Sequence, residues 1–462
     1  KQPPLPLRPS TPALLMLRLA SSRSAALGAA ATRTQQPMSI RLVRVARAHS
    51  TQAVDEDEVA PVRPEISQAA NMMDIGTRRI FNEEHDAFRE TCRKFYAEHI
   101  VPHSGAGGEW ETQQHISREA WLKAGEYGLL GINCPEKYGG LGASILEAAI
   151  SWEECMYAEG SPSGPGFALH SDICIPYILH YGTEAQKEQW IPGMCDGSTI
   201  GAIAMTEPGA GSDLQGLRTT AIKQEDGTYV LNGSKTYITN GWMSDLVIVV
   251  AKTNPEAKGS AAMSLFLVDP KLAGFSKGNP LKKAGLKAQD TCELFFEDVV
   301  LPPDALLGDE GRGFAYLMEE LPQERLIIAV DTQARAENAF ETTRAWCNDR
   351  VAFGKPLIAK QTVAHKLAEM KTAICINRAF VDQCLMLHHE GRLDTATASM
   401  AKMSSTDLAW KICDDAVQLH GGMGFMWETS VARQLADTRV HRIYGGANEI
   451  MKELIARTCK TA

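Results

Sequence analysis

The stretch Ala204-Met205-Thr206-Glu207-Pro208-Gly209-Ala210-Gly211-Ser212-Asp213 decides the fold, together with Tyr237-Ile238-Thr239-Asn240-Gly241 about thirty residues later. Alone, a loop with two glycines and flanking hydroxyls is either a phosphate cradle or a simple turn. The second stretch places an aromatic ring and a hydroxyl on a predicted strand. Both lie where the sequence changes its period, from helical before about residue 200 to extended between about 201 and 309.

Helical patterns flank this extended region. Apolar residues recur there at three- to five-residue spacing, as in amphipathic helices: Phe88, Cys92, Phe95 and Ile100 before it, and Val363, Leu367, Met370 and Ile374 after it. Long helical hairpins after Gly313 are typical of a four-helix bundle. The sequence therefore predicts a mainly α protein with a central β domain. We expect a linker at 55–75, an N-terminal helical domain at 76–200, a middle β-barrel at 201–312 and a C-terminal bundle at 313–462.

Strands are predicted in the middle region from runs of Val, Ile, Leu and Phe. Asn232-Gly233 predicts a hairpin turn between Tyr229–Leu231 and Ser234–Thr239, because this dipeptide favours positive φ. Further strands are expected at Leu246–Ala251, Ser264–Val268 and Cys292–Phe296. No βαβ alternation and no GxGxxG motif occur, so a Rossmann domain is not expected.

The first 54 residues hold eight basic residues, and no Asp or Glu precedes Asp55. This composition, rich in Ser, Ala, Leu and Thr, is typical of a mitochondrial or plastid transit peptide at residues 1–54. Of these two locations, we expect the mitochondrial matrix. The alternative is a basic arm that binds nucleic acid. Without these eight charges the formal net charge moves from −9 to about −17, which disfavours nucleic-acid binding. No apolar run approaches about 18 residues, so no transmembrane helix is expected.

The eleven cysteines are scattered and form no CxxC pair, a pattern typical of a reducing compartment. The twelve histidines show no HExxH spacing. We therefore expect neither a disulfide framework nor a catalytic metal.

Two more blocks complete the pattern: Arg350-Val351-Ala352-Phe353-Gly354-Lys355-Pro356-Leu357, followed by Gln361, and Gln418-Leu419-His420-Gly421-Gly422-Met423-Gly424-Phe425. With the two stretches quoted first, all four blocks resemble those of the acyl-CoA dehydrogenases and stand in the order of that family. The resemblance runs from about Phe81 to Arg457. It implies the acyl-CoA dehydrogenase fold and FAD as cofactor.

The resemblance also implies roles for individual residues. Thr206 is expected at the pyrimidine edge of the flavin, with the backbone N–H groups of Met205 and Thr206 facing the ring. Tyr237 would pack on the isoalloxazine ring with Thr239 beside it, and Ser212 would contact the cofactor pyrophosphate and the substrate. In the family, the later blocks reach the FAD of a partner subunit. The residues expected there are Arg350, which would pair with pyrophosphate, and Phe353, Gln361, Gln418, Gly421 and Gly422.

The stretch Ile443-Tyr444-Gly445-Gly446-Ala447-Asn448-Glu449-Ile450 resembles the family's catalytic loop, whose usual form is Tyr-Glu-Gly-Thr. The Glu of that form is the base that removes the substrate's α-proton, and here its position is Gly445. Tyr444, Gly445 and Gly446 are expected to contact the substrate, and Ala447 and Glu449 the cofactor. Ala447 replaces a Thr whose hydroxyl usually contacts the cofactor, so one hydrogen bond is missing; with many contacts remaining, we expect flavin binding to survive.

The missing base has five candidates: Glu319, Glu320, Glu324, Glu428 and Glu449. Glu324 stands in a Glu-Arg-Leu sequence where the long-chain and isovaleryl branches of the family carry their base, and both branches have Gly in the loop. We therefore expect Glu324 to be the catalytic base, at a helix start after Pro322, with Arg325 at the substrate. Gly445 is expected to donate its backbone N–H to the thioester oxygen, and the bound acyl chain to raise the pKa of Glu324 towards neutrality.

The expected function is FAD-dependent α,β-dehydrogenation of saturated acyl-CoA to trans-2-enoyl-CoA in fatty-acid β-oxidation. The motifs most resemble the long-chain branch of the family; branched-chain (isovaleryl-type) and medium-chain substrates are alternatives. The resemblance implies electron-transferring flavoprotein as partner and a homotetramer, at least a homodimer. Two other hypotheses are an acyl-CoA oxidase, which would hand its electrons to oxygen, and a catalytically silent acyl-CoA-binding scaffold. The ending Cys459-Lys460-Thr461-Ala462 lacks the Ser-Lys-Leu of many oxidases.

Overall fold

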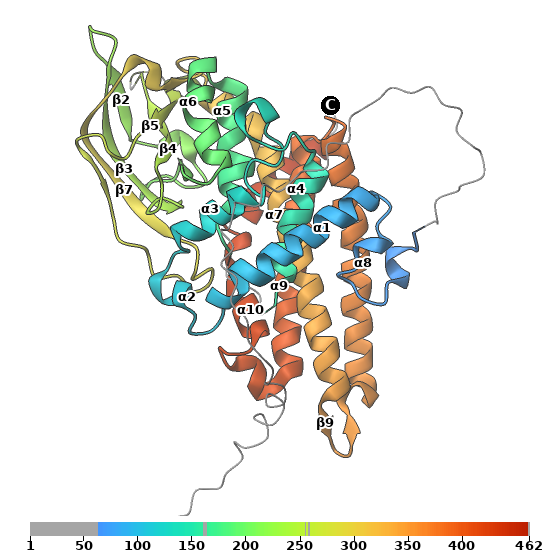
Figure 1. Cartoon of the computed structure of the whole chain (residues 1–462). Coiled ribbons are helices and arrows are strands. Elements are labelled where there is room, and N and C mark those ends of the chain that lie inside the picture. The colour runs from blue at the N-terminus through green and yellow to red at the C-terminus, as the bar shows by residue number, and fades with distance from the viewer. Residues whose placement is uncertain (1–62, 160–163, 255, 257–258, 461–462) are drawn as a thin grey trace, which may run out of the picture. The chain divides into compact units, whose positions relative to one another are not determined.

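The computed structural model describes residues 63–159, 164–254, 256 and 259–460 of the chain. The predicted transit peptide lies outside these residues, and so does the first part of the predicted linker. The described chain runs from helices through strands to long helices, so the predicted fold is confirmed (Figure 1). The domain bounds at residues 76, 201 and 313 stay a prediction.

Six α-helices form the N-terminal part: α1 (Glu83–Phe95), α2 (Glu109–Gln113), α3 (Arg118–Glu126), α4 (Ile145–Tyr157), α5 (Ile175–Tyr181) and α6 (Glu184–Cys195). Helix α1 begins with a capping box, in which Asn82 accepts from the His85 backbone and the His85 ring accepts from the Asn82 backbone. The predicted stripe is confirmed, because Cys92, Phe95 and Ile100 are buried. Helix α4 is buried almost throughout and packs on both α1 and α7.

The middle part is an eight-stranded sheet. Its strands are β1 (Gly201–Ala204), β2 (Thr220–Lys223), β3 (Tyr229–Thr239), β4 (Leu246–Lys252), β5 (Met263–Val268), β6 (Phe275–Lys277), β7 (Thr291–Leu301) and β8 (Leu306–Leu307). The order is β6-β7-β3-β2-β4-β5-β8, with β1 on β4. The pairs β1–β4 and β2–β4 are parallel and the others antiparallel. Strand β4 is buried on both faces: Leu246 and Ile248 pack towards the helices, and Val247 and Val249 within the sheet domain.

The predicted hairpin at Asn232-Gly233 is wrong. Residues 229–239 form one continuous strand, with a register shift against β7 between Leu231 and Gly233. Gly233 has a φ of 143°, and a Cβ there would lie 2.5 Å from the Thr219 hydroxyl, so this glycine serves a bulge and a close contact. The turn into β3 lies earlier, at Gly227.

Long helices form the C-terminal part: α7 (Gly313–Asp349), α8 (Gln361–His389) and α9 (Thr395–His420), followed by α10 (Ser430–His441) and α11 (Asn448–Thr458). A short hairpin, β9 (Val351–Ala352) with β10 (Lys355–Pro356), joins α7 to α8 (Figure 1). The stripe predicted on α8 is confirmed by the buried Leu367, Met370 and Ile374. The expected helix start after Pro322 is wrong, because α7 begins at Gly313 and continues through this proline.

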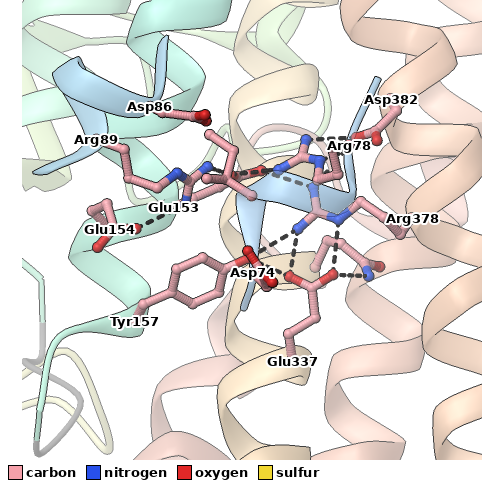
Figure 2. Close-up of polar contacts among 12 residues, drawn as sticks. Asp74, Arg78, Asp86, Arg89, Glu153, Glu154, Tyr157, Glu337, Arg378 and Asp382 are labelled. Carbon is pink, nitrogen blue, oxygen red and sulfur yellow. Dashed lines mark hydrogen bonds and ion pairs between the residues drawn. The ribbon is translucent and has the colours of Figure 1, made fainter. Parts of the chain in front are cut away.

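A buried network of ion pairs ties the N-terminal helices to the bundle (Figure 2). Arg378 of α8 donates to Glu153 of α4 at 2.8 Å and to Glu337 of α7 at 2.8 Å. Arg78 and Arg89 donate to the same Glu153, and these three arginines, with burial opposing them, hold the pKa of Glu153 well below its usual range. Because the charges are buried in pairs, removal of one partner would leave an uncompensated charge.

Within the described residues, no helix is both long enough and apolar enough to cross a bilayer. The eleven cysteines are all free thiols.

Candidate active site

A cavity of about 240 Å³ lies where the sheet domain meets α7 and the loop between α10 and α11. Seven of the predicted site residues line it: Met205, Thr206, Tyr237, Thr239, Glu324, Tyr444 and Gly445. These residues are separated by up to 240 positions in the sequence, and the fold brings them together around one space.

Glu324 is buried in the wall of this cavity on α7, with 7% of its surface exposed. The Tyr177 hydroxyl of α5 donates a hydrogen bond of 3.0 Å to its Oε1 atom. Burial raises the pKa of Glu324 to about 7, assisted by the nearby Glu320 and opposed by the Tyr177 hydrogen bond. A carboxyl with this pKa is suited to accept a proton near neutral pH.

Gly445 lies in the same wall and has a left-handed backbone, with φ of 62°. A Cβ at this position would lie 2.3 Å from Cδ1 of Ile328, which follows Glu324 by one turn of α7. Lys402 of α9 holds the loop, because its Nζ donates to the Gly446 carbonyl at 2.8 Å and to Asn448 Oδ1 at 2.9 Å. The loop therefore presents backbone, and no side chain, at Gly445.

The opposite wall comes from β1 and β3. Tyr237 is 69% exposed and has a φ of 59°, at a second register shift between β3 and β7. Backbone strain of this kind in non-glycine residues clusters at active sites and ligand-binding sites. The buried Lys235 stabilises the loop after β1, because its Nζ donates to the Met205 carbonyl at 3.0 Å and to Glu207 at 2.9 Å.

Six predicted residues lie elsewhere, at the end of the bundle where α7 and α9 finish. Trp346 of α7 and His420 of α9 stack there at 5.0 Å, so the two helix ends are neighbours. The six are exposed on the hairpin, on the adjoining ends of α7, α8 and α9, and on the turn after α9: Arg350, Phe353, Gln361, Gln418, Gly421 and Gly422. Phe353 is 95% exposed, with a φ of 55°. Their roles towards a cofactor stay a prediction.

Five more predicted residues do not line the cavity. Ser212 and Glu449 are exposed. Arg325 is buried and donates to Ser399 Oγ at 3.3 Å, and Gly446 packs near its guanidinium. Ala447 is the N-cap of α11, where it offers no side-chain acceptor. A Thr hydroxyl at position 447 would cap this helix. Ala447 therefore removes a helix cap as well as a hydroxyl expected to contact the cofactor.

The sequence did not point to several residues of the site. Tyr177, Lys402, Asp331, Arg335 and His441 either line the cavity or hold its walls. No sequence motif surrounds any of these residues, and each is one of many polar or aromatic residues in the helices. Only the fold identifies them.

The wall residues fit a flavin. Tyr237 offers an exposed aromatic face, Thr206 and Thr239 offer hydroxyls, and apolar side chains line the space between. A planar ring with one polar edge matches this set. The buried carboxyl of Glu324, whose pKa is raised to about 7, lies across the cavity from these wall residues. The fold and the site therefore define a flavin-dependent oxidoreductase.

Comparisons with known proteins give the family. Three models match: acyl-CoA dehydrogenase, N-terminal domain, at residues 82–198; middle domain, at 202–299; and C-terminal domain, at 311–460. The chain is 57% identical over 399 residues to the mitochondrial long-chain specific acyl-CoA dehydrogenase of Mus musculus, covering 86% of this chain and 91% of that one. This chain belongs to the acyl-CoA dehydrogenase family, whose members are FAD-dependent oxidoreductases of CH–CH bonds in acyl-CoA.

Solved structures of acyl-CoA dehydrogenases are also similar to this chain. The acyl-CoA dehydrogenase of Geobacillus kaustophilus is 46% identical, with a TM-score of 0.80, over 83% of this chain and all of that one. A glutaryl-CoA dehydrogenase of Mycobacterium smegmatis, in complex with FADH2, is 27% identical, with a TM-score of 0.76, over 84% of this chain and 97% of that one.

Proposed function

We propose that this protein oxidises long-chain acyl-CoA to trans-2-enoyl-CoA in fatty-acid β-oxidation, with Glu324 as the base. The observation that carries the assignment of the base is that Glu324 and Gly445 line one cavity, so a carboxylate on α7 faces the loop that lacks one. The relative at 57% identity, which is long-chain specific by name, supports the chain length.

The reaction begins with removal of the α-proton, and that proton is only weakly acidic even beside a thioester. Glu324 takes it on a carboxylate oxygen, and burial, by raising the pKa of this carboxyl, makes it a stronger base than an exposed glutamate. Tyr177 orients the carboxylate through its hydroxyl. A bound acyl chain would exclude further water and raise the pKa of Glu324 more.

The thioester oxygen gains negative charge as the proton leaves, and a fixed donor stabilises it. The backbone N–H of Gly445 is the donor in the loop, and Lys402 holds that loop in place through the Gly446 carbonyl. FAD, when bound against Tyr237 and Thr206, supplies the acceptor for the hydride of the β-carbon.

The remaining assignments follow from the relatives and the surface. We propose the mitochondrial matrix as location, which the names of the relatives support, and electron-transferring flavoprotein as the electron acceptor. The exposed Phe353 and Phe425, which are 95% and 86% exposed at one end of the bundle, support a homotetramer, or at least a homodimer. In such an assembly Arg350 and Gln361 would reach the partner's FAD.

The test is a ladder of saturated acyl-CoA substrates, assayed with an artificial electron acceptor. Wild-type enzyme should give its highest kcat/KM with a long chain, and Glu324→Gln should lower kcat by about 10²- to 10⁴-fold. Glu319→Gln is the control, since this exposed carboxylate lies on the same helix. Near wild-type turnover by Glu324→Gln would refute the base.

Further outcomes separate the other functions. An optimum with isovaleryl-CoA or medium chains would move the protein to another branch. Rapid reoxidation by oxygen with product bound would make it an oxidase. Binding of acyl-CoA without flavin reduction in the wild type would make it a silent scaffold.

A further inference from the structure

The cavity continues past the base along one face of α7. Its lining includes Glu324, Ile327, Ile328, Asp331 and Arg335, whose spacing places them on one side of the helix. At 1.5 Å per residue, Asp331 lies about 10 Å beyond Glu324 along the axis and Arg335 about 16 Å beyond. An acyl chain that leaves the reaction centre in this direction meets these two side chains.

This far part of the cavity is polar where a saturated chain would favour an apolar wall. Asp331, Arg335 and His441 all line it. Asp437 behind them is already engaged, because it accepts from the Leu286 backbone at 2.6 Å and from Arg335 at 3.4 Å. Asp331 is only partly buried and faces the cavity, and it also lines a smaller adjoining cavity of about 40 Å³.

His441 adds a second polar side chain to this lining. Its side chain is 2% exposed, and its Nδ1 makes no hydrogen bond with a described residue. Burial lowers the pKa of His441 to about 3, as does Arg335, while the nearby Thr438 carbonyl opposes this change. The ring is therefore neutral at physiological pH, and an alkyl chain beside it would offer it no hydrogen bond.

The acidic and basic groups around this part of the cavity decide whether it favours a charged or a neutral group on the acyl chain. Burial raises the pKa of Asp331 to about 7, with Arg335 opposing and Asp172 adding to the rise, and burial also raises the pKa of Asp172 to about 7. A carboxylate on the acyl chain would meet Asp331, with Asp172 behind it in the wall of the adjoining cavity, and Arg335 is already paired with Asp437. A neutral group that donates a hydrogen bond suits the site better.

We propose that this cavity takes acyl chains that carry a hydroxyl group about 10 Å beyond the α-carbon, with Asp331 accepting its hydrogen bond and the His441 ring as a second polar neighbour. The inference rests on the proposed function, because it places the α-carbon at Glu324. It makes Asp331 and His441 determinants of substrate specificity.

The test compares palmitoyl-CoA with positional isomers of hydroxypalmitoyl-CoA and with hexadecanedioyl-CoA, whose tail carries a carboxylate. For wild-type holoenzyme, one hydroxylated isomer should exceed palmitoyl-CoA in kcat/KM by on the order of tenfold. Asp331→Val should abolish this preference, and Asp331→Asn, which keeps a hydrogen-bonding group, should retain part of it. Asp349→Asn is the control, an exposed change at the far end of α7 that should leave the ratio unchanged.

Three outcomes would overturn the proposal: equal preference in wild type and Asp331→Val, no hydroxylated isomer better than palmitoyl-CoA, or hexadecanedioyl-CoA as the best substrate. Dissociation constants from calorimetry give the same ratio without turnover. If wild type oxidises none of the substrates, the proposed function fails, while the ratio of binding constants still decides this inference. If Asp331→Val does not fold, Asp331→Asn and His441→Phe supply the comparison.

Discussion

Glu324→Gln should gain stability at alkaline pH while it loses activity. Burial raises the pKa of this carboxyl from 4.5 to about 7, so the folded protein disfavours the ionised form. The carboxyl therefore contributes its full stability below about pH 4.5, and that contribution is lost as the pH rises through 7. The whole change amounts to about 3 kcal/mol, of which about 2 kcal/mol falls between about pH 5.5 and pH 8.5.

Glutamine resembles the protonated acid in shape and cannot ionise. Relative to wild type, the free energy of unfolding of Glu324→Gln should therefore rise by about 2 kcal/mol from about pH 5.5 to pH 8.5. Other titrating groups cancel in this difference, since both proteins share them. The measurement is guanidinium unfolding of both proteins at both pH values, at matched protein and FAD concentrations, because bound cofactor and subunits shift apparent stability.

Glu319→Gln controls for the loss of a charge on α7, because it removes an exposed carboxylate from the same helix. The reasoning is refuted if Glu324→Gln shows the same stability relative to wild type at both values. That result would mean that the resting enzyme accommodates the ionised carboxylate without penalty.

Three further predictions concern the walls of the site. Tyr177→Phe removes the hydrogen bond that lowers the pKa of Glu324, so the pKa should rise further and the acidic limb of the pH–kcat/KM profile should move to higher pH; an unmoved limb would contradict this. Lys402→Met frees the Gly446 carbonyl and should lower kcat by about tenfold with little change in FAD content, measured by flavin absorbance; equal kcat would show that the loop holds itself. Ala447→Thr supplies the absent cap of α11 and should raise the free energy of unfolding by about 1 kcal/mol in urea titration, and a loss of stability would argue that this position faces something other than the helix end.

The elements that the sequence predicted well are those with a long, regular period. The predicted stripes at Phe88–Ile100 and on α8 face the core as expected, because a helix that must cover a core repeats its apolar residues over several turns. The strands β4 and β5 were found from their unbroken apolar runs, which reflect burial on both faces.

The errors arose where tertiary contacts override local preference. Asn232-Gly233 is a strong turn signal, yet Gly233 is there because the Thr219 backbone passes too close for a side chain. Pro322 is a strong helix-start signal, yet α7 continues through it because its buried face packs on α9 and α4. Both sequence signals report local backbone preference correctly. Neither contains information about contacts with residues distant in the sequence.

The site shows the same division. Glu324 was found because a short sequence surrounds it, whereas Tyr177, which orients it, lies 147 residues away and has no motif. The polar lining at Asp331 and His441 also has no local signal, because a charged residue on a helix is ordinarily on the solvent side. The sequence alone does not indicate which face of a helix lines a cavity.

Gly445 and Glu324 are linked through packing as well as through chemistry. A side chain at Gly445 would require a left-handed backbone, at about 1–2 kcal/mol for an ordinary residue, and would meet Ile328 at 2.3 Å. Ile328 lies one turn beyond Glu324, so the turn of α7 that supplies the base also occupies the space that a loop carboxylate would need. A glutamate restored at 445 would have to displace Ile328 and change the loop backbone before it reached the substrate. The position of the base is therefore set by the shape of this wall, and exchanging one carboxylate for the other requires rebuilding both elements together.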